Sequence, residues 1–316
     1  MRKLIGLVIL LILLWSGGVF FVNRTVNSTL ETLRSEGWDI SADQSMARSF
    51  GLMGTQLSNL KAISNLGWWF IQTEKLTTGL RTIAPTTLRT IISGQTTIDL
   101  AEKNTIQITK GMISTDLRIG LRQNVPIRML GVVSDAISIE GDTLLTGWEE
   151  LEFKVLEVLD GDYLVIGNWQ EIGLVPDLHF QLDPVGNVLP ETITAIALEG
   201  AVKFNGVIAL NDPSPRYLTK FTLQEMAVIW GNISLIAAGE LTINDRGIPE
   251  GLMTITVQNA SLLITLMMDA GMLPPENQSI FDMMMQPDGS LSLPIRFRDG
   301  QMSMGFIPLG PSPVFR

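Results

Sequence analysis

The sequence predicts a mainly β protein, a β-rich α+β fold whose body is a curved antiparallel meander sheet. Two observations predict the sheet: apolar and polar residues alternate over short stretches, and turns that contain Gly separate these stretches roughly every 8–15 residues. A third observation, a long apolar run at the N-terminus, predicts a transmembrane helix ahead of the sheet. A short helical insert is expected near the C-terminus.

The N-terminal run, Leu4–Val22, carries no charge, and its only hydroxyl is that of Ser16. As a helix it would be roughly 28 Å long, close to the thickness of a bilayer core. Arg2 and Lys3 favour a cytoplasmic N-terminus. No later stretch of the sequence is long and apolar enough to cross again. We therefore expect residues 1–22 to be a single-pass anchor in a bacterial inner membrane, with the body of the chain in the periplasm.

A cleaved signal peptide is the competing interpretation of this run. Leu4–Trp15 would then be its apolar core, and the small residues Ser16 and Gly18 could flank the cleavage site. Cleavage there would leave Val19–Val22 as an exposed apolar start, and the sequence has no Ala-x-Ala site. We therefore favour the uncleaved anchor.

A short amphipathic helix follows the anchor. Val26, Leu30 and Leu33 recur at helical spacing, and Gly37 stands where a left-handed residue would end the helix. Residues 23–36 are therefore predicted to be a helical stalk. Residues 37–316 are predicted to be an extracytoplasmic β-rich domain, with two halves meeting near 141–150.

Beyond the stalk the apolar period changes from 3.6 to 2, as expected of strands with one apolar and one polar face. The clearest alternating stretches are 105–109, 116–121, 136–140, 151–156, 163–166, 240–243 and 252–257. Three turns that contain Gly predict hairpins: Asp160-Gly161-Asp162, Asn244-Asp245-Arg246-Gly247 and Arg298-Asp299-Gly300.

The C-terminal region combines a helical insert with a last hairpin. Leu262, Leu263, Leu266, Met267 and Ala270 form one helix face, which Gly271 and Pro274-Pro275 end, and a second short helix is expected over Glu276–Met285. Pro294 in the hairpin predicts an edge position or a bulge. The candidate apolar groove consists of the apolar hairpin face and the insert, namely Leu293, Ile295, Phe297, Met302, Met304, Phe306, Leu266 and Met267.

Composition excludes several classes of function. The net charge is −10 and no basic run follows the N-terminus, which argues against nucleic acid as a partner and against docking onto anionic lipid by charge. Cysteine is absent, so disulfides, thiolate catalysis and zinc-thiolate sites are excluded. The sequence contains neither a Gly-x-Ser-x-Gly elbow nor a glycine-rich phosphate loop. We predict no catalytic residue, no cofactor and no metal site, and hence not an enzyme.

Two features of the sequence could indicate a catalytic or metal site, but each is interpreted as structural. His179 is the only histidine, and Asp177 would share its face of a strand and could orient its ring, but strand alternation alone gives this spacing. Methionine is abundant, with 15 residues that cluster towards the C-terminus. Thioethers can bind Cu(I), but flexible packing or a yielding lipid contact is the favoured interpretation.

Several stretches are rich in Gly, Pro and apolar residues: Leu14–Gly17, Gly67–Trp69, Ala84-Pro85, Gly239–Gly247, Asp269–Leu273 and Ile307–Pro313. In these stretches and in the order of its parts, the chain resembles the DUF2125 family of alphaproteobacterial proteins, which have an anchor and no assigned function. The stretch Phe50-Gly51-Leu52-Met53 departs from the Gly-Phe-Pro of that pattern. The resemblance implies, by a more distant similarity to AsmA-like envelope proteins, a curved sheet that presents an apolar groove to lipid.

Three functional hypotheses follow. The first is a membrane-tethered binding module that holds lipid or another hydrophobic envelope component on the apolar face of an incompletely closed sheet. The second is a structural or scaffolding envelope protein whose sheet closes on a dry core and whose polar surface meets a protein partner of unknown identity. The third, an enzyme, has the least support in the residue inventory. An open or a filled inner face discriminates between the first two.

Overall fold

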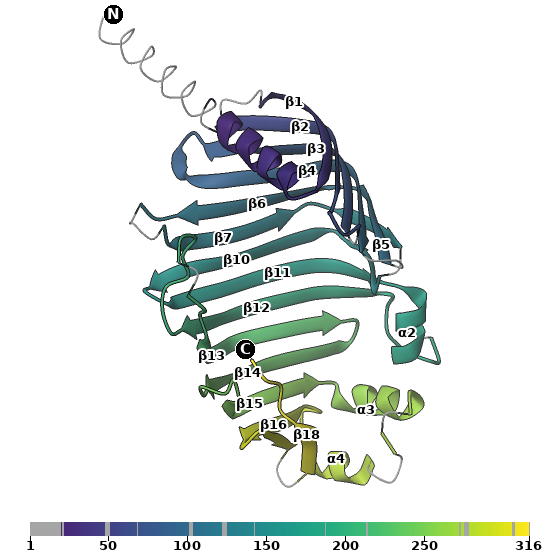
Figure 1. The fold of residues 1–316 in the computed structure, drawn as a ribbon. Helices are drawn as coiled ribbons and strands as arrows, with labels where there is room; N and C mark the ends of the chain where they lie inside the picture. Colours follow the sequence, from purple (N-terminus) through teal and green to yellow (C-terminus); the bar gives the residue numbers. More distant parts are fainter. Residues whose placement is uncertain are drawn as a thin grey trace, which may run out of the picture. The chain divides into compact units, whose positions relative to one another are not determined.

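The computed structural model describes residues 20 and 22–315, except residues 48–50, 68, 101–103, 122–124, 142, 187, 213, 272, 275–277 and 305–306. The chain divides into two compact units, one formed by residues 1–121 and 128–143, the other by residues 122–127 and 144–316. Strands dominate both units, which confirms the prediction of a mainly β protein with antiparallel meander pairing (Figure 1). Most of the expected anchor lies outside the described residues. Among the described helices, none is both long and apolar enough to cross a membrane.

The first unit is built on strands that pair in chain order. From β1 through β2 and β3 to β4, each strand is antiparallel to the next. Further along, β5 pairs with β8. The strands are β1 (Asp39–Met46), β2 (Leu52–Ile63), β3 (Trp69–Arg81), β4 (Ala84–Leu100), β5 (Asn104–Lys110), β6 (Met112–Ile119), β7 (Ile127–Ser134) and β8 (Ile137–Gly141).

Gly94 divides the long strand β4 between two partners. Residues 87–93 pair with β6, whereas residues 96–100 pair with β5. Gly94 has φ +84° between these two segments, and the register of β3 shifts beside it, around Glu74. A Cβ atom at Gly94 would lie 2.2 Å from Glu74 Oε2, so a larger residue would clash. Glycine therefore permits the backbone break that sends one strand to two neighbours.

The N-terminal helix over residues 22–35 lies on this sheet. Val26, Leu30 and Leu33 pack against a buried cluster around Ile40 and Leu57. The helix ends as expected, because Gly37 has φ +93° and the Trp38 amide donates to the Leu33 carbonyl oxygen at 3.0 Å. The residues expected to form a stalk thus bury their apolar stripe against the strands of the unit.

The second unit is a meander in which nearly every strand pairs with the next along the chain. From β10 to β18 all pairs are antiparallel, and β9 pairs with β11. All three predicted hairpins are confirmed at their turns. The strands are β9 (Leu145–Trp148), β10 (Glu150–Leu159), β11 (Asp162–Leu174), β12 (Thr192–Phe204), β13 (Leu218–Trp230), β14 (Ile233–Ile243), β15 (Pro249–Gln258), β16 (Leu291–Arg298), β17 (Gln301–Met304) and β18 (Ile307–Pro311).

The helical insert is confirmed between β15 and β16. It comprises α3 (Ala260–Asp269) and α4 (Gln278–Met284), and Gly271 has φ +68° just after α3. A further helix, α2 (Pro176–Leu182), follows β11. It corrects the prediction that His179 lies on a strand, because Pro176 occupies the first helical position, where its fixed φ and missing N–H are suited to starting a helix.

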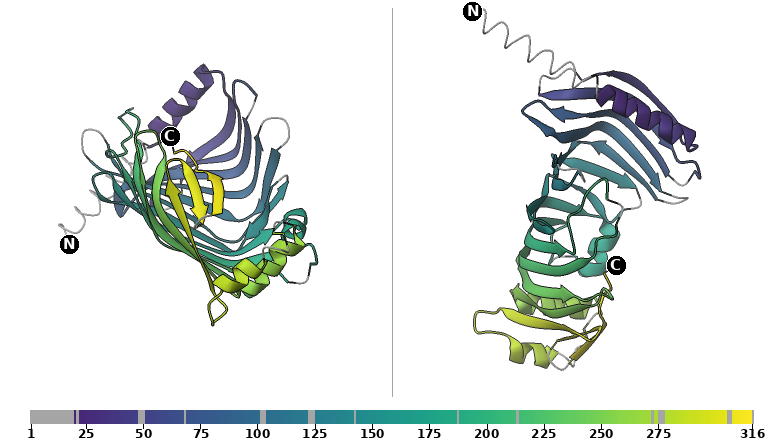
Figure 2. Two further views of the ribbon diagram at one scale, coloured as in Figure 1. Left: turned by 90° about the horizontal axis from the view of Figure 1, so that it is seen from below. Right: turned by 60° about the vertical axis from the view of Figure 1, so that its left-hand side comes forward.

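The strands of the second unit are bent, as the end-on view in Figure 2 shows. Gly239 of β14 (φ +157°) and Gly251 of β15 (φ +150°) lie two positions apart along this pair of strands. A Cβ atom at Gly239 would lie 2.3 Å from the Leu252 carbonyl oxygen, and one at Gly251 would lie 2.1 Å from that of Glu240. Glycine is therefore needed where the two backbones bend together.

Candidate functional site

Register defines an apolar face on the sheet of the second unit. Residues directly opposite each other in an antiparallel pair point to the same side, so each pair extends the face by one strand. Trp230 lies opposite Ile233, Leu235 opposite Val257, and Val257 opposite Leu291. The apolar face consists of Ile196, Leu198, Val202, Phe204, Phe221, Leu223, Met226, Val228, Trp230, Ile233, Leu235, Ala237, Leu241, Met253, Ile255, Val257, Leu291, Leu293, Ile295, Phe297, Met302 and Met304, together with intervening glycines.

The opposite side of the same strands is polar. Lys203 pairs with Asp162 at 3.0 Å between β12 and β11, and Lys220 pairs with Glu240 at 2.8 Å between β13 and β14. These ion pairs are largely exposed, so they add little stability, but they keep that side of the sheet in water. The apolar face, in contrast, has no Lys, Arg, Asp or Glu among its members.

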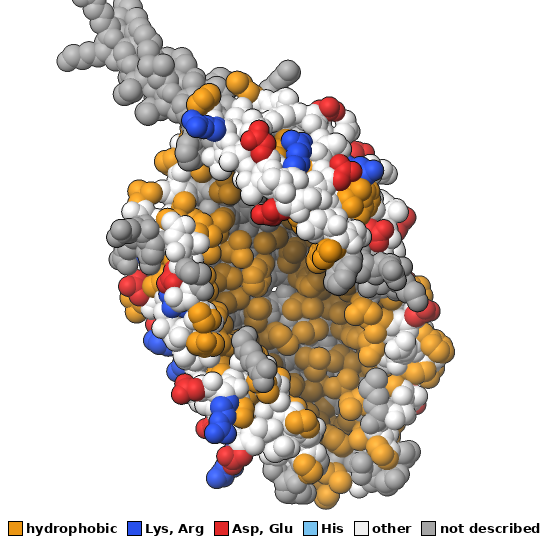
Figure 3. Space-filling view, in the orientation of Figure 1, with side chains coloured by type: hydrophobic (Ala, Val, Ile, Leu, Met, Phe, Trp, Pro, Cys, Tyr) orange, Lys and Arg blue, Asp and Glu red, His pale blue; other side chains and the backbone are white. Residues whose placement is uncertain are grey.

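The apolar face is sealed at the end where the helical insert covers it. There α3 packs on β14, β15 and β16, and Ile233, Val257 and Leu291 are at most 3% exposed under Ile264 and Leu266. Further along the strands Ala237, Leu223 and Leu241 are still buried. Their neighbours Met253, Ile295 and Phe297 are only half-buried, and Met226 is 36% exposed. Figure 3 shows hydrophobic side chains gathered in a hollow over strands of this unit. Within the described residues, the face is thus a sealed core beneath α3 and, beyond it, a partly exposed apolar surface, here called its open part, in which some residues are buried.

The last hairpin places its apolar residues on this open part. Ile295 lies opposite Met304, and Phe297 lies opposite Met302. Pro294 lies opposite Thr254 of β15, just before the residues of β16 that pair with β17. At Pro294, therefore, β16 has a partner strand on the β15 side only. A proline is tolerated at such an edge position because no second strand needs its missing N–H. Phe306 of the predicted groove lies outside the described residues.

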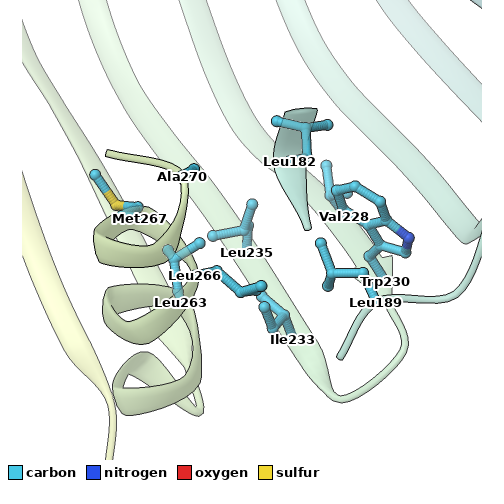
Figure 4. Close-up of a pocket in the computed structure, with 10 residues that line it drawn as sticks. All are labelled: Leu182, Leu189, Val228, Trp230, Ile233, Leu235, Leu263, Leu266, Met267 and Ala270. Carbon is cyan, nitrogen blue, oxygen red and sulfur yellow. The ribbon is translucent and has the colours of Figure 1, made fainter. Parts of the chain in front are cut away.

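The two groove residues predicted on α3 differ in burial. Leu266 is 3% exposed and belongs to the sealed core, whereas Met267 is half-buried. Both line a cavity of about 140 Å³ between α3 and strands β13 and β14 (Figure 4). Leu293 also packs against the core cluster, so the predicted set spans both the sealed and the open parts of the face.

A loop after α2 forms the wall of the cavity opposite α3. The Asp183 carboxylate is fully buried and accepts hydrogen bonds from the amides of Gly186, Val188 and Leu189 at 2.8–3.0 Å. Burial alone would raise the pKa of Asp183. The three amides, with a smaller contribution from His179, outweigh burial and hold that pKa below its ordinary value. The carboxylate thereby folds the loop into one defined shape.

His179 supports the same loop. Its Nε2 atom lies 2.9 Å from the Leu189 carbonyl oxygen. Asp177 is two residues before it on α2, and residues two apart on a helix do not face each other. The expectation that Asp177 and His179 share one face of a strand is therefore wrong. No group of three or more His, Asp or Glu side chains in the described part of the chain is arranged to hold a metal ion.

Sequence reasoning missed the loop and most of the apolar face. Asp183 followed by Pro184 and Gly186 is a turn signal that could have suggested a capping carboxylate. In β12 and β13 the polar alternates of the apolar residues are often Ala or Ile, as at Ala195, Ala197 and Ile229, so the period of two is weak in the sequence. The face emerges only when register aligns these strands with β14.

Comparison with known proteins gives one match. The chain matches the model of a family described as "Uncharacterized protein conserved in bacteria (DUF2125)" over residues 15–313. Searches of curated proteins and of solved structures give no significant match. The matched region includes both units, the N-terminal helix and the α3–α4 insert, so the chain belongs to the DUF2125 family.

Proposed function

We propose that this protein binds lipid acyl chains on the apolar face of its second unit while tethered to the bacterial inner membrane through Leu4–Val22. In this proposal the N-terminus is cytoplasmic and the two units lie in the periplasm. The tether rests on the sequence alone, because Leu4–Val22 is apolar on every side and bilayer-long. Lipid is then the hydrophobic compound nearest to the sheet.

The observation that carries the proposal is the partial exposure of an uncharged face. Large side chains such as Phe221, Phe297 and Met302 remain half-buried on strands whose other side is polar. Soluble domains rarely leave contiguous apolar patches of more than a few hundred Å² in water, and larger patches usually mark binding surfaces. A ligand that is itself apolar and extended would bury this surface without leaving a buried charge unpaired.

The methionine side chains on the apolar face favour a flexible ligand over a rigid one. Met226, Met253, Met302 and Met304 lie on the open part of the face. Unbranched, polarizable thioether side chains adapt to ligands of variable shape, as surfaces that bind several partners require. Acyl chains of different lengths and unsaturation are ligands of this kind.

The second candidate is a scaffold whose apolar face is covered by another protein. A protein partner would bury the same exposed surface, and the identity of the bound molecule distinguishes the two candidates. The full-length chain would be extracted from membranes in a mild detergent and analysed by native mass spectrometry. Lipid binding predicts mass additions that extract into organic solvent and are identified as lipids, in constant stoichiometry after gel filtration. A delipidated protein bound to a defined protein partner would support the scaffold and contradict the proposal.

A further inference from the structure

We propose that the cavity between α3 and strands β13 and β14 receives the methyl end of a lipid acyl chain and so limits the chain length that the protein binds. This inference rests on the proposed function. It adds which end of the ligand is enclosed and which part of the protein encloses it. It concerns only the second unit.

The chemistry of the walls selects an apolar group. α3 supplies Leu263, Leu266 and Met267, and the sheet supplies Val228 and Leu235 (Figure 4). One polar side-chain atom belongs to the lining residues, the indole nitrogen of Trp230, and its N–H already donates to the Pro190 carbonyl oxygen at 2.7 Å. A headgroup placed there would lose its hydrogen bonds to water and gain none. A hydrocarbon end has no such bonds to lose.

The size of the cavity fits the end of a chain and not a whole lipid. Its volume is about 140 Å³. An engineered apolar cavity of about 150 Å³ in another protein stays dry and binds benzene, so this volume holds a group of a few carbons. The remainder of an acyl chain must therefore lie outside the cavity.

The apolar face provides the path for that remainder. Val228 and Leu235 lie opposite each other and belong both to the cavity wall and to the apolar face. The next pair along the same strands, Met226 and Ala237, continues the face away from α3. A chain lying across the open part of the face thus meets the cavity at its α3 end, where the sealed core stops it.

The wall opposite α3 is held in place before any ligand arrives. Leu189 lines the cavity, its amide donates to Asp183 at 2.8 Å, and its carbonyl oxygen lies 2.9 Å from His179 Nε2. A wall fixed from both sides by hydrogen bonds keeps the volume constant, and a constant volume is what allows a cavity to discriminate chain length.

The first test compares fatty acids of two lengths on the full-length protein in detergent. Ala270 lines the cavity at the end of α3, and Ala270→Leu would fill part of it. Leucine displaces roughly three ligand carbons and each buried methylene contributes about fourfold in affinity, so the ratio of hexadecanoate to decanoate affinity should fall by roughly sixtyfold. Ser261→Leu adds a leucine to the exposed side of α3 and should leave the ratio unchanged.

The second test locates the chain end in the wild-type cavity, and Trp230→Phe serves only to subtract the fluorescence of the other tryptophans. Hexadecanoate brominated near the methyl end should quench Trp230 fluorescence, measured as the difference between the wild type and Trp230→Phe, several-fold more than hexadecanoate brominated near the carboxyl end. If neither acid binds the wild type, the proposed function itself fails. If both bind, but Ala270→Leu behaves like Ser261→Leu and the two brominated acids quench equally, the cavity assignment is overturned while lipid binding stands.

Discussion

Ile295 of β16 lies directly opposite Met304 of β17, and both side chains belong to the open part of the apolar face. The pair lies beyond the part of the strands that α3 covers, and both residues are half-buried. A substitution at Met304 therefore alters the surface offered to a ligand more than it alters the packed core. This relationship provides a direct test of the groove.

Met304→Glu should weaken lipid retention strongly while changing stability little. The carboxylate can reach water from a half-exposed position, so we expect a cost below about 1.5 kcal/mol in unfolding free energy. In a closed core an unpaired carboxylate would cost several kcal/mol. Thermal melting and bound lipid are measured on the same sample. Ser303→Glu, one residue away on the polar side, is the matched control and should keep its lipid. Unfolding of Met304→Glu, with no lipid in the wild type, would refute the groove.

Gly239→Ala should destabilise the second unit by more than about 2 kcal/mol. The new Cβ atom would lie 2.3 Å from the Leu252 carbonyl oxygen, so the β14 and β15 backbones would have to separate. Gly167→Ala on β11 is the control, because the nearest atom to its Cβ is a Phe153 side-chain carbon at an ordinary 3.4 Å, and it should stay within about 1 kcal/mol of the wild type. Urea unfolding measures both variants, and equal effects would contradict the assigned bend.

Asp183→Asn should lower the melting temperature at pH 7 because a neutral amide accepts hydrogen bonds from the loop amides more weakly than a carboxylate does. The pKa of Asp183 is lower in the folded than in the unfolded chain, so its stabilisation is full above the unfolded value of about 4 and is lost as pH falls further. The difference in melting temperature between the wild type and Asp183→Asn should therefore become smaller below about pH 4. A difference that does not change with pH would show that the charge of Asp183 does not stabilise the fold.

His179→Gln should cost only about 1 kcal/mol, because one hydrogen bond to the Leu189 carbonyl oxygen is altered. In cells from which the gene has been deleted, expression of the His179→Gln variant should restore the wild-type phenotype. Differential scanning calorimetry and complementation are the measurements. A null phenotype in a normally folded His179→Gln protein would indicate a chemical role for the imidazole.

The anchor leads to a prediction about processing. The mature protein should retain Met1–Val22 and remain with the inner membrane after a carbonate wash. Mass spectrometry of the N-terminal peptide is the direct measurement. A mature start near Val19 would mean that the segment is a signal peptide and would remove the tether from the proposed function.

The sequence predicted those elements whose physics is local. The turns at Gly161, Gly247 and Gly300 all have positive φ, and α3 ends where Gly271 permits it. Local signals such as these need only a few neighbouring residues. The helix over 22–35 was equally visible, but its packing on Ile40 and Leu57 was not, because a stripe does not reveal what will cover it.

The candidate site was predicted only in part, because register is not local. Leu293, Ile295 and Phe297 alternate with polar residues and were visible as one face. Joining them to Trp230 and Val228 needs the pairing of four strands. His179 was expected on a strand because apolar and polar residues alternate around it, whereas Pro176 starts a helix there.

Sequential pairing in the second unit has a consequence for how the chain folds. From β10 to β18 each strand pairs with the next along the chain, either through a tight turn or across an insert. The inserts include the α2 loop between β11 and β12 and the α3–α4 segment between β15 and β16. Contacts between strands are therefore local, and the entropy lost in closing loops is modest. The sheet can grow strand by strand as the chain is synthesised. The strand nearest the C-terminus arrives last, and until then each newly added strand exposes an unpaired edge that a holding chaperone would have to shield.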